Sequence, residues 1–428
     1  MLALLLALQA PVSPAQALTD SLPRITLNEA LQRAARLDPN YVAALGQVDN
    51  AAWGRRNAFA VFVLPSVTLG ANWSQVNPVG FSPVPLKTVV TAQLTARYDL
   101  FTGGQKIAEL SRSAAGLEGA RANELVARFA TALLTESDYY AVLSDRELAR
   151  VTQDRLRRAR QGVSVARARV QSGAAVQTDS LQFLLEQNRA EVGALQQDAA
   201  LRESRLQLGR RVGAAGPVDA VPLDTVLMAE LPLPLADAIA QAAEQGPQYR
   251  VARADERAAR AAYRARLGDY LPHATLTFTA VAFDTVFYPK FFKQSTIGVG
   301  VSFPLWDNGR REVALSQARV NRDVAHAVRA DMDRAVQHDV TAAYDAYVTA
   351  RATYVLAVQG LAVARENYRV QEARYRSGST TILDILDAQL GLSEAEAGLV
   401  QARYGTRLAL AGLEAILGRR LFTDKDTP

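Results

Sequence analysis

Four segments of the chain alternate between apolar residues and small or polar residues with a period of two. They span about residues 66–75, 88–100, 273–283 and 295–306. This alternation predicts β-strands with one apolar face, and each segment has about the 9–11 residues of a tilted membrane strand. Aromatic residues near the segment ends suit the interfacial girdles of membrane barrels: Trp73, Tyr98, Phe283, Phe303 and Trp306. A water-soluble sheet with one buried face predicts the same alternation, so both interpretations stay open here.

Two long stretches lack proline, the main helix breaker, and are rich in helix-favouring residues. No proline occurs between Pro85 and Pro217, or between Pro304 and Pro428. The pattern predicts long helices over about 104–171 and 309–376, each roughly 100 Å long at 1.5 Å per residue. Two shorter helices broken at a glycine are the alternative. The second stretch contains only Gly360, which favours continuity.

The two halves of the chain match each other, which indicates a duplication rather than a short repeat. Leu100 corresponds to Leu305 and Gly173 to Gly378, with the same offset of 205 positions. Each unit reads helix, helix, strand, strand, long helix, helix. The expected division is a first repeat over 18–213, a connection over 214–235, a second repeat over 236–421 and a tail over 422–428. Glycines occupy the expected turns between strand and long helix, and those at the helix tips: Gly103, Gly104 and Gly309, then Gly173 and Gly378.

Four strands cannot close a barrel, and an open sheet edge cannot lie in lipid. Copies of the chain must therefore associate if the strands cross a membrane. Two copies give eight strands, a barrel filled by its own side chains. Three copies give twelve strands, the smallest assembly here that holds water.

Composition excludes several classes of protein. The chain has 428 residues, no cysteine and three scattered histidines, His273, His326 and His338. Disulfides and a cysteine nucleophile are excluded, and a histidine metal site is not favoured. The formal net charge of +5 is spread in mixed sign, so no basic block indicates nucleic acid. No nucleophile motif, metal cluster or phosphate loop points to an enzyme, and no cofactor is expected.

The N-terminus has the pattern of a secretory signal peptide over residues 1–17. An apolar run at 2–8 is followed by Ala15-Gln16-Ala17, an A-x-A cleavage signature. The alternative is an apolar tail without a targeting role. A signal peptide predicts export from the cytoplasm.

The stretch "SGSTTILDILDAQ" (377–389), the strand-to-helix turns "LFTGG" and "LWDNG", the duplication and the two strand pairs together resemble the TolC-type outer-membrane efflux proteins over about residues 25–421. The resemblance implies an α+β membrane protein: a trimer with a 12-stranded β-barrel continuous with a 12-helix periplasmic tunnel. It further implies an outer-membrane exit duct for a tripartite efflux pump or a type I secretion system. The implied partners are outer-membrane lipid, a periplasmic adaptor and an inner-membrane transporter.

The resemblance also assigns residues at the periplasmic entrance. Asp384 and Asp387, three positions apart, match the paired acids that line the closed mouth. Thr178, Asp179 and Tyr375 match residues whose hydrogen bonds hold that mouth shut. An alternative is that Asp384 and Asp179 are ordinary first-turn helix acids that favour the helix dipole.

One position departs from the family pattern. The arginine of the gate network is replaced by Thr380, with Arg374 and Arg376 as candidate substitutes. A second interpretation of the whole chain is a periplasmic coiled-coil adaptor or scaffold protein. An adaptor would carry a lipoyl-like β domain between its helices and no paired amphipathic strands.

Overall fold

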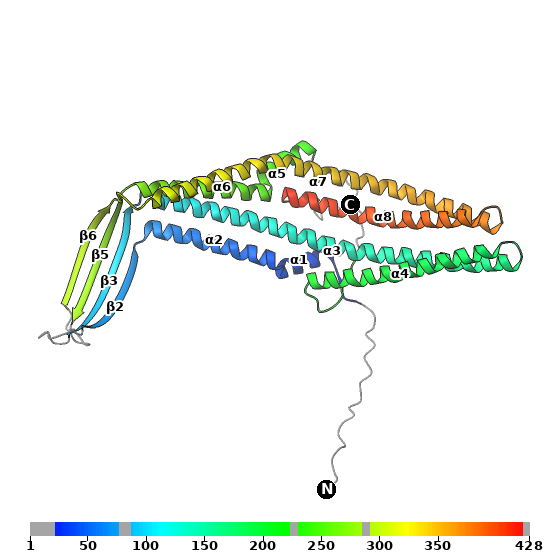
Figure 1. The fold of residues 1–428 in the computed structure, drawn as a ribbon, viewed down its shortest axis with the longest axis horizontal. Helices are drawn as coiled ribbons and strands as arrows, with labels where there is room; N and C mark the ends of the chain where they lie inside the picture. Colours follow the sequence, from blue (N-terminus) through cyan, green and yellow to red (C-terminus); the bar gives the residue numbers. More distant parts are fainter. Residues whose placement is uncertain (1–21, 77–86, 223–229, 285–291, 423–428) are drawn as a thin grey trace, which may run out of the picture.

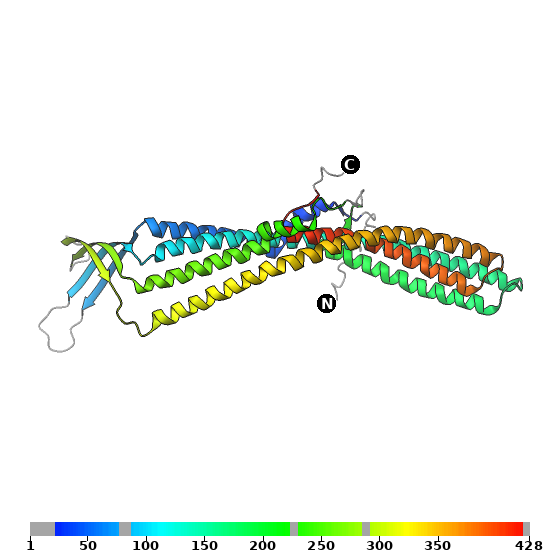
Figure 2. The same ribbon diagram turned by 90° about the horizontal axis from the view of Figure 1, so that it is seen from above.

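The computed structural model describes residues 22–76, 87–222, 230–284 and 292–422. The expected signal peptide, most of both strand-hairpin connections and nearly all of the tail lie outside these residues. The chain is strongly elongated, with a four-stranded sheet at one end and helix tips at the other (Figures 1 and 2). No helix within the described residues is both long enough and apolar enough to cross a membrane.

Four long strands form one antiparallel sheet in the order β2-β3-β5-β6. Their bounds are Ser66–Val76, Lys87–Phe101, His273–Asp284 and Phe292–Ser302. Each repeat supplies one hairpin, and β3 joins the hairpins by pairing with β5 from Val90↔Asp284 to Phe101↔Ala274. The outer edges of β2 and β6 have no strand partner among the described residues.

Neither face of this sheet is covered by the chain itself. Within these four strands, no residue whose exposure is described is buried, and apolar side chains such as Leu69 (78% exposed) and Ile297 (73% exposed) face the solvent. A sheet of a water-soluble protein would bury its apolar face against a core. The exposed apolar face therefore favours the membrane interpretation of the alternation.

The strand order continues into a layer of helices. α2, α3, α6 and α7 lie side by side in that order, each attached to the corresponding strand (Figure 2). Their bounds are Pro39–Val63, Gln105–Gln171, Pro247–Leu267 and Arg310–Arg376. The short helix η1, Gly268–Tyr270, leads from α6 to β5.

The two longest helices, α3 and α7, have 67 residues each and run unbroken past their internal glycines. Each turns back at its tip into a second helix, α4 (Gln177–Arg211) or α8 (Ile382–Leu417). The far half of the molecule is thus a pair of helical hairpins that pack on each other, mainly through α3 and α8.

Midway along the molecule, short elements tie the two repeats together. α1 (Leu27–Leu37) and α5 (Leu235–Gln245) begin the repeats, and β1 (Arg24–Ile25) pairs in parallel with β4 (Asp219–Ala220). Figure 1 shows α1 and α5 near the middle of α3 and α7. The hydroxyl oxygen of Tyr139 lies 2.7 Å from the carbonyl oxygen of Val221 at this junction.

The structure corrects one strand. The sequence pattern places the fourth strand at 295–306, whereas β6 spans Phe292–Ser302. The ladder with β5 ends at His273↔Ser302, and Pro304 has no N–H to extend it. Phe303 and Trp306 therefore lie beyond the strand, and Trp306 is 77% exposed.

Candidate functional site at the helix tips

The two helix tips have the same local structure, as the duplication leads one to expect. Both end in a Schellman motif: the Ala174 amide donates to the carbonyl oxygen of Arg169, and the Ser379 amide to that of Arg374, both at 2.8 Å. Gly173 and Gly378 supply the required left-handed backbone, with φ of 75° and 81°.

The N-terminus of α8 is fixed by a capping box. The Thr381 hydroxyl accepts from the Asp384 amide at 3.3 Å, and the Asp384 carboxylate accepts from the Thr381 amide at 3.0 Å. The hydroxyls of Thr381 and Thr380 also donate to this carboxylate, at 2.6 and 2.8 Å. These bonds hold the pKa of Asp384 down to about 2. Within one chain, Asp384 therefore acts as a capping residue in the first turn of α8.

Both acids of the expected entrance ring point away from the packed interior of the tip. Asp384 and Asp387 are exposed, whereas Ile382, two residues before Asp384, and Ile385, between the two acids, are buried. The isoleucines join a small core with Val163, Ala166, Phe183 and Tyr375. The apolar side of α8 thus fixes the rotation of the helix and leaves both carboxylates on its open side.

Tyr375 is buried at 2% exposure between the two hairpins. Its ring meets Phe183 of α4 edge-on at 5.7 Å, and the Arg169 guanidinium lies 4.6 Å from the ring centroid. Its hydroxyl has no hydrogen-bond partner among the described residues. Burial raises the pKa of Tyr375, and the nearby charge of Asp179 raises it further.

The expected gate residues are only partly brought together. Asp179 lies close enough to affect Tyr375 electrostatically, but no hydrogen bond joins them within the described chain. Thr178 is exposed. Neither candidate arginine reaches them: Arg376 pairs with Glu372 at 2.6 Å, and Arg374 donates to the carbonyl oxygen of Ser379 at 3.4 Å.

Sequence reasoning missed the cation that does contact Tyr375. Arg169 of the first repeat donates to the Tyr375 carbonyl oxygen as well as covering its ring. A second missed contact joins Arg158 of α3 to Glu396 of α8 at 3.1 Å. One signal was available for Arg169, which occupies the same position in the first repeat as Arg374 in the second.

The strand-to-helix turns are built on glycines with positive φ: Gly103 (58°), Gly104 (85°) and Gly309 (77°). Gly103 is also constrained by space, because a Cβ there would lie 2.5 Å from the Gly268 carbonyl oxygen. This contact holds the start of α3 against the end of α6, beneath the sheet.

No group of three or more metal-ligating side chains occurs within the described ranges of the chain. The sheet has two open edges and an exposed apolar face. It is continuous with helices that are far longer than a globular core, and these helices end in tips with exposed acids. These features define a membrane channel of the outer-membrane type with a helical tunnel.

Comparisons with known proteins agree with that class. A family model described as outer membrane efflux protein matches residues 238–419, within the second repeat. The pyoverdine export outer membrane protein OpmQ of Pseudomonas putida is 26% identical over 358 residues, covering 79% of this chain and 73% of OpmQ. The outer membrane efflux protein BepC of Brucella suis is 25% identical over 283 residues, covering 66% and 61%.

Solved structures share the fold over nearly the whole chain. The CmeC outer membrane channel of Campylobacter jejuni has a TM-score of 0.81 at 16% identity, covering 93% of this chain and 87% of CmeC. VceC of Vibrio cholerae has a TM-score of 0.76 at 18% identity, covering 92% and 97%. The chain is similar in sequence to outer-membrane efflux proteins and shares the fold of solved outer-membrane channels, which confirms the resemblance expected from its motifs. These relatives and solved structures are outer-membrane channels, and the adaptor interpretation is set aside.

Proposed function

We propose that the chain works as a homotrimer that forms the outer-membrane exit duct of a tripartite efflux pump or type I secretion system. A periplasmic adaptor and an inner-membrane transporter complete the assembly. The observation that carries the proposal is the open sheet. β2 and β6 each keep one unpaired edge among the described residues, and their apolar side chains are exposed. Lipid tolerates neither edge, so β6 of one copy pairs with β2 of the next.

Cysteine crosslinking tests this pairing directly, because the chain has no cysteine of its own. Each variant carries two cysteines in the same chain. One replaces a residue on the polar face of β2, such as Thr68, and the other replaces a residue of β6, such as Gly300. Oxidation in membranes should give a covalent trimer for the pairs in register. A matched control puts the second cysteine on β3, which is shielded between β2 and β5. A chain that stays monomeric for every β2–β6 pair contradicts the trimer.

The two strand hairpins are proposed to face outside the cell, since the helices lie on the opposite side of the sheet. Their connections lie mostly outside the described residues. Cysteines at Ser82 and Lys290 should react with a reagent that cannot cross the outer membrane. Reaction only after the membrane is breached argues for the opposite orientation.

At the other end, Asp384 and Asp387 are proposed to form the entrance ring. Three copies would bring six carboxylates together on the open sides of α8. Crowding of like charges raises pKa values. It therefore opposes the hydrogen bonds that hold the pKa of Asp384 to about 2 in the single chain. The ion selectivity of the wild type and of Asp384→Ala/Asp387→Ala tests the ring.

Thr178, Asp179 and Tyr375 are proposed to hold the entrance closed. The Tyr375 hydroxyl is buried and has no hydrogen-bond partner among the described residues. The Asp179 carboxylate is close enough for its charge to raise the pKa of Tyr375, so it is the proposed acceptor. A small approach of α4 to α7 would form the bond, which contributes about 0.5–1.5 kcal/mol or more to a charged acceptor. Asp179→Ala should therefore raise conductance in planar bilayers. Glu191→Ala, at an exposed position on the same helix, is the control, and equal conductance for the two variants argues against a gate here.

A further inference from the structure

A stripe of arginines runs along one face of α6. Five of the six arginines of this helix follow one another at spacings of three, four, three and four residues: Arg250, Arg253, Arg257, Arg260 and Arg264. Residues at these spacings share a helix face. Because 14 residues separate the first from the last, the stripe is about 21 Å long and runs parallel to the long axis of the molecule.

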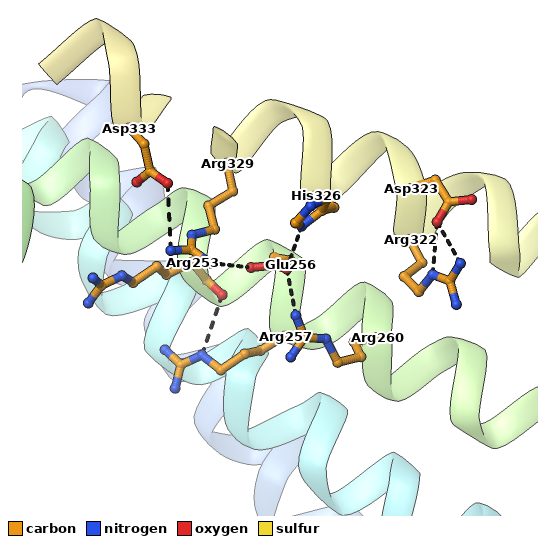
Figure 3. Close-up of polar contacts among 9 residues, drawn as sticks. All are labelled: Arg253, Glu256, Arg257, Arg260, Arg322, Asp323, His326, Arg329 and Asp333. Atoms are coloured by element: carbon orange, nitrogen blue, oxygen red, sulfur yellow. Dashed lines mark hydrogen bonds and ion pairs between the residues drawn. The ribbon is translucent and has the colours of Figure 1, made fainter. Parts of the chain in front are cut away.

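The stripe is not balanced by the acids of its own helix. Of the two acids of α6, Asp255 lies on the opposite face, and Glu256 is only 5% exposed and already paired with two arginines, Arg260 and Arg329. Figure 3 shows the Glu256 carboxylate between Arg260 of α6 and His326 and Arg329 of α7. The contacts measure 2.6, 3.1 and 3.4 Å. Burial opposes its ionisation, but these bonds lower the pKa of Glu256, so it stays a carboxylate.

The remaining arginines have weak or no charge partners. Arg257 pairs with Glu118 of α3 at 2.6 Å, where both side chains are at least 40% exposed. Arg253 lies over the Tyr249 ring at 4.3 Å. Arg250 and Arg264 form no ion pair with any residue in the described part of the chain. A solvated helix face usually mixes both signs, whereas this one presents one sign along its whole length.

The stripe lies on the outer side of the helix layer. A cleft between α2, α3 and α6 is lined by Ala262, Ala265 and Arg266, on the face of α6 opposite the stripe. The same cleft is lined by Asp99, which belongs to the polar face of β3. The polar face of a membrane sheet is turned inward, because the apolar face meets lipid. The cleft is therefore inside, and the stripe is outside.

We propose that this outer face of α6 binds the carboxylates of the cell-wall polymer, the peptide-bearing glycan of the periplasm. The proposal rests on the proposed function, which places these helices in the periplasm. Arginine binds carboxylates through paired N–H donors, and a polymer with regularly placed carboxylates can contact several arginines at once. Phospholipid headgroups form a layer parallel to the membrane. They would reach only the Arg264 end of a stripe that runs away from the sheet.

The test uses the full-length protein in detergent and purified, insoluble cell-wall sacculi, with the bound fraction measured by sedimentation. The test variant is Arg250→Gln/Arg257→Gln/Arg264→Gln. It leaves Arg260, the partner of buried Glu256, and Arg253 in place, so the α6–α7 contact is kept. The control Arg157→Gln/Arg189→Gln/Arg202→Gln removes three exposed arginines of the α3–α4 hairpin, away from the stripe, and changes the net charge equally.

The wild type and the control should bind sacculi equally well at low salt. The test variant should bind roughly tenfold more weakly, because it loses three exposed ionic contacts that each contribute little. Salt should reduce wild-type binding, and sacculi with amidated carboxylates should not bind. Equal binding by the test and control variants overturns the proposal. So does a defect that appears only with vesicles of phosphatidylglycerol, which would identify a headgroup site instead. Channel conductance of the wild type and of both variants is recorded in parallel. A wild type that forms no channels refutes the proposed function. A wild type that forms channels but does not bind sacculi refutes only the proposal for the arginine stripe.

Discussion

Arg420, just beyond the end of α8, joins two buried carboxylates from different repeats. Its guanidinium donates to Glu136 of α3 and, at 2.9 Å, to Glu414 of α8. The carboxylate side chains are 3% and 4% exposed, while that of Arg420 is 41% exposed. Burial raises the pKa of Glu136, although the charge of Arg420 lowers it. We predict that Arg420→Met destabilises the fold where the C-terminal end of α8 meets the middle of α3.

The size of the effect follows from these exposures. Breaking a fully buried ion pair by removing one partner costs about 3–5 kcal/mol. Here water reaches Arg420, and Arg407 adds a second positive charge near Glu136, so we expect about 2–3 kcal/mol. Arg419→Met, at the exposed neighbouring position, should change stability by no more than about 0.5 kcal/mol.

The pH dependence adds a second test of Arg420. A carboxyl whose folded pKa is raised contributes stability at low pH, and that contribution is lost as pH rises through the folded pKa. Removing Arg420 raises the folded pKa of Glu136 further. The deficit of Arg420→Met should therefore be smallest near pH 4 and grow toward pH 8. Thermal unfolding of the detergent-solubilised protein across this range measures it. A deficit equal to that of Arg419→Met, or independent of pH, refutes the reasoning.

Three further predictions concern the turns and the tip. Gly103→Ala should destabilise the protein by more than Gly104→Ala. Both need positive φ, at about 1–3 kcal/mol each, but only at position 103 would a Cβ meet the Gly268 carbonyl oxygen; equal melting temperatures would contradict this. Asp384→Asn should remove a stability contribution that the wild type has above pH 3.8 and loses as pH falls toward 2, as pH-dependent unfolding of both proteins would show. Tyr375→Phe, which keeps the buried ring but removes the hydroxyl, should raise conductance in planar bilayers as Asp179→Ala does, because the proposed gate bond is lost; a conductance equal to that of the wild type would mean that this hydroxyl does not hold the entrance closed.

The large elements of the fold could be read from the sequence because each one repeats a simple pattern over many residues. Two proline-free stretches predicted α3 and α7 to within one residue at each end. The period-two segments predicted the four long strands, and the duplication predicted that both tips turn alike. The end of β6 was misplaced because the alternation runs on to Phe303, whereas the ladder stops where β5 begins.

Short and long-range features could not be read in this way. β1 and β4 have two residues each, which is too short for any period, and they lie far apart in the sequence. The contact of Arg420 with Glu136 and that of Arg158 with Glu396 each join residues more than 200 positions apart. The capping role of Asp384 was visible, since Thr381 precedes it by three positions. Whether the same carboxylate also belongs to a ring depends on neighbouring copies of the chain.

The most direct test of the central claim is single-channel recording of the wild type and of Asp384→Ala/Asp387→Ala in planar bilayers. The account predicts that the wild type forms channels that prefer cations and are blocked by a trivalent cation from the periplasmic side. The double variant should still fold and form channels, because both side chains are exposed and the capping hydroxyl of Thr381 remains. It should lose both the cation preference and the block. A double variant that keeps its reversal potential and its block would show that the acids do not line the entrance. A wild-type protein that forms no channel would contradict the account as a whole.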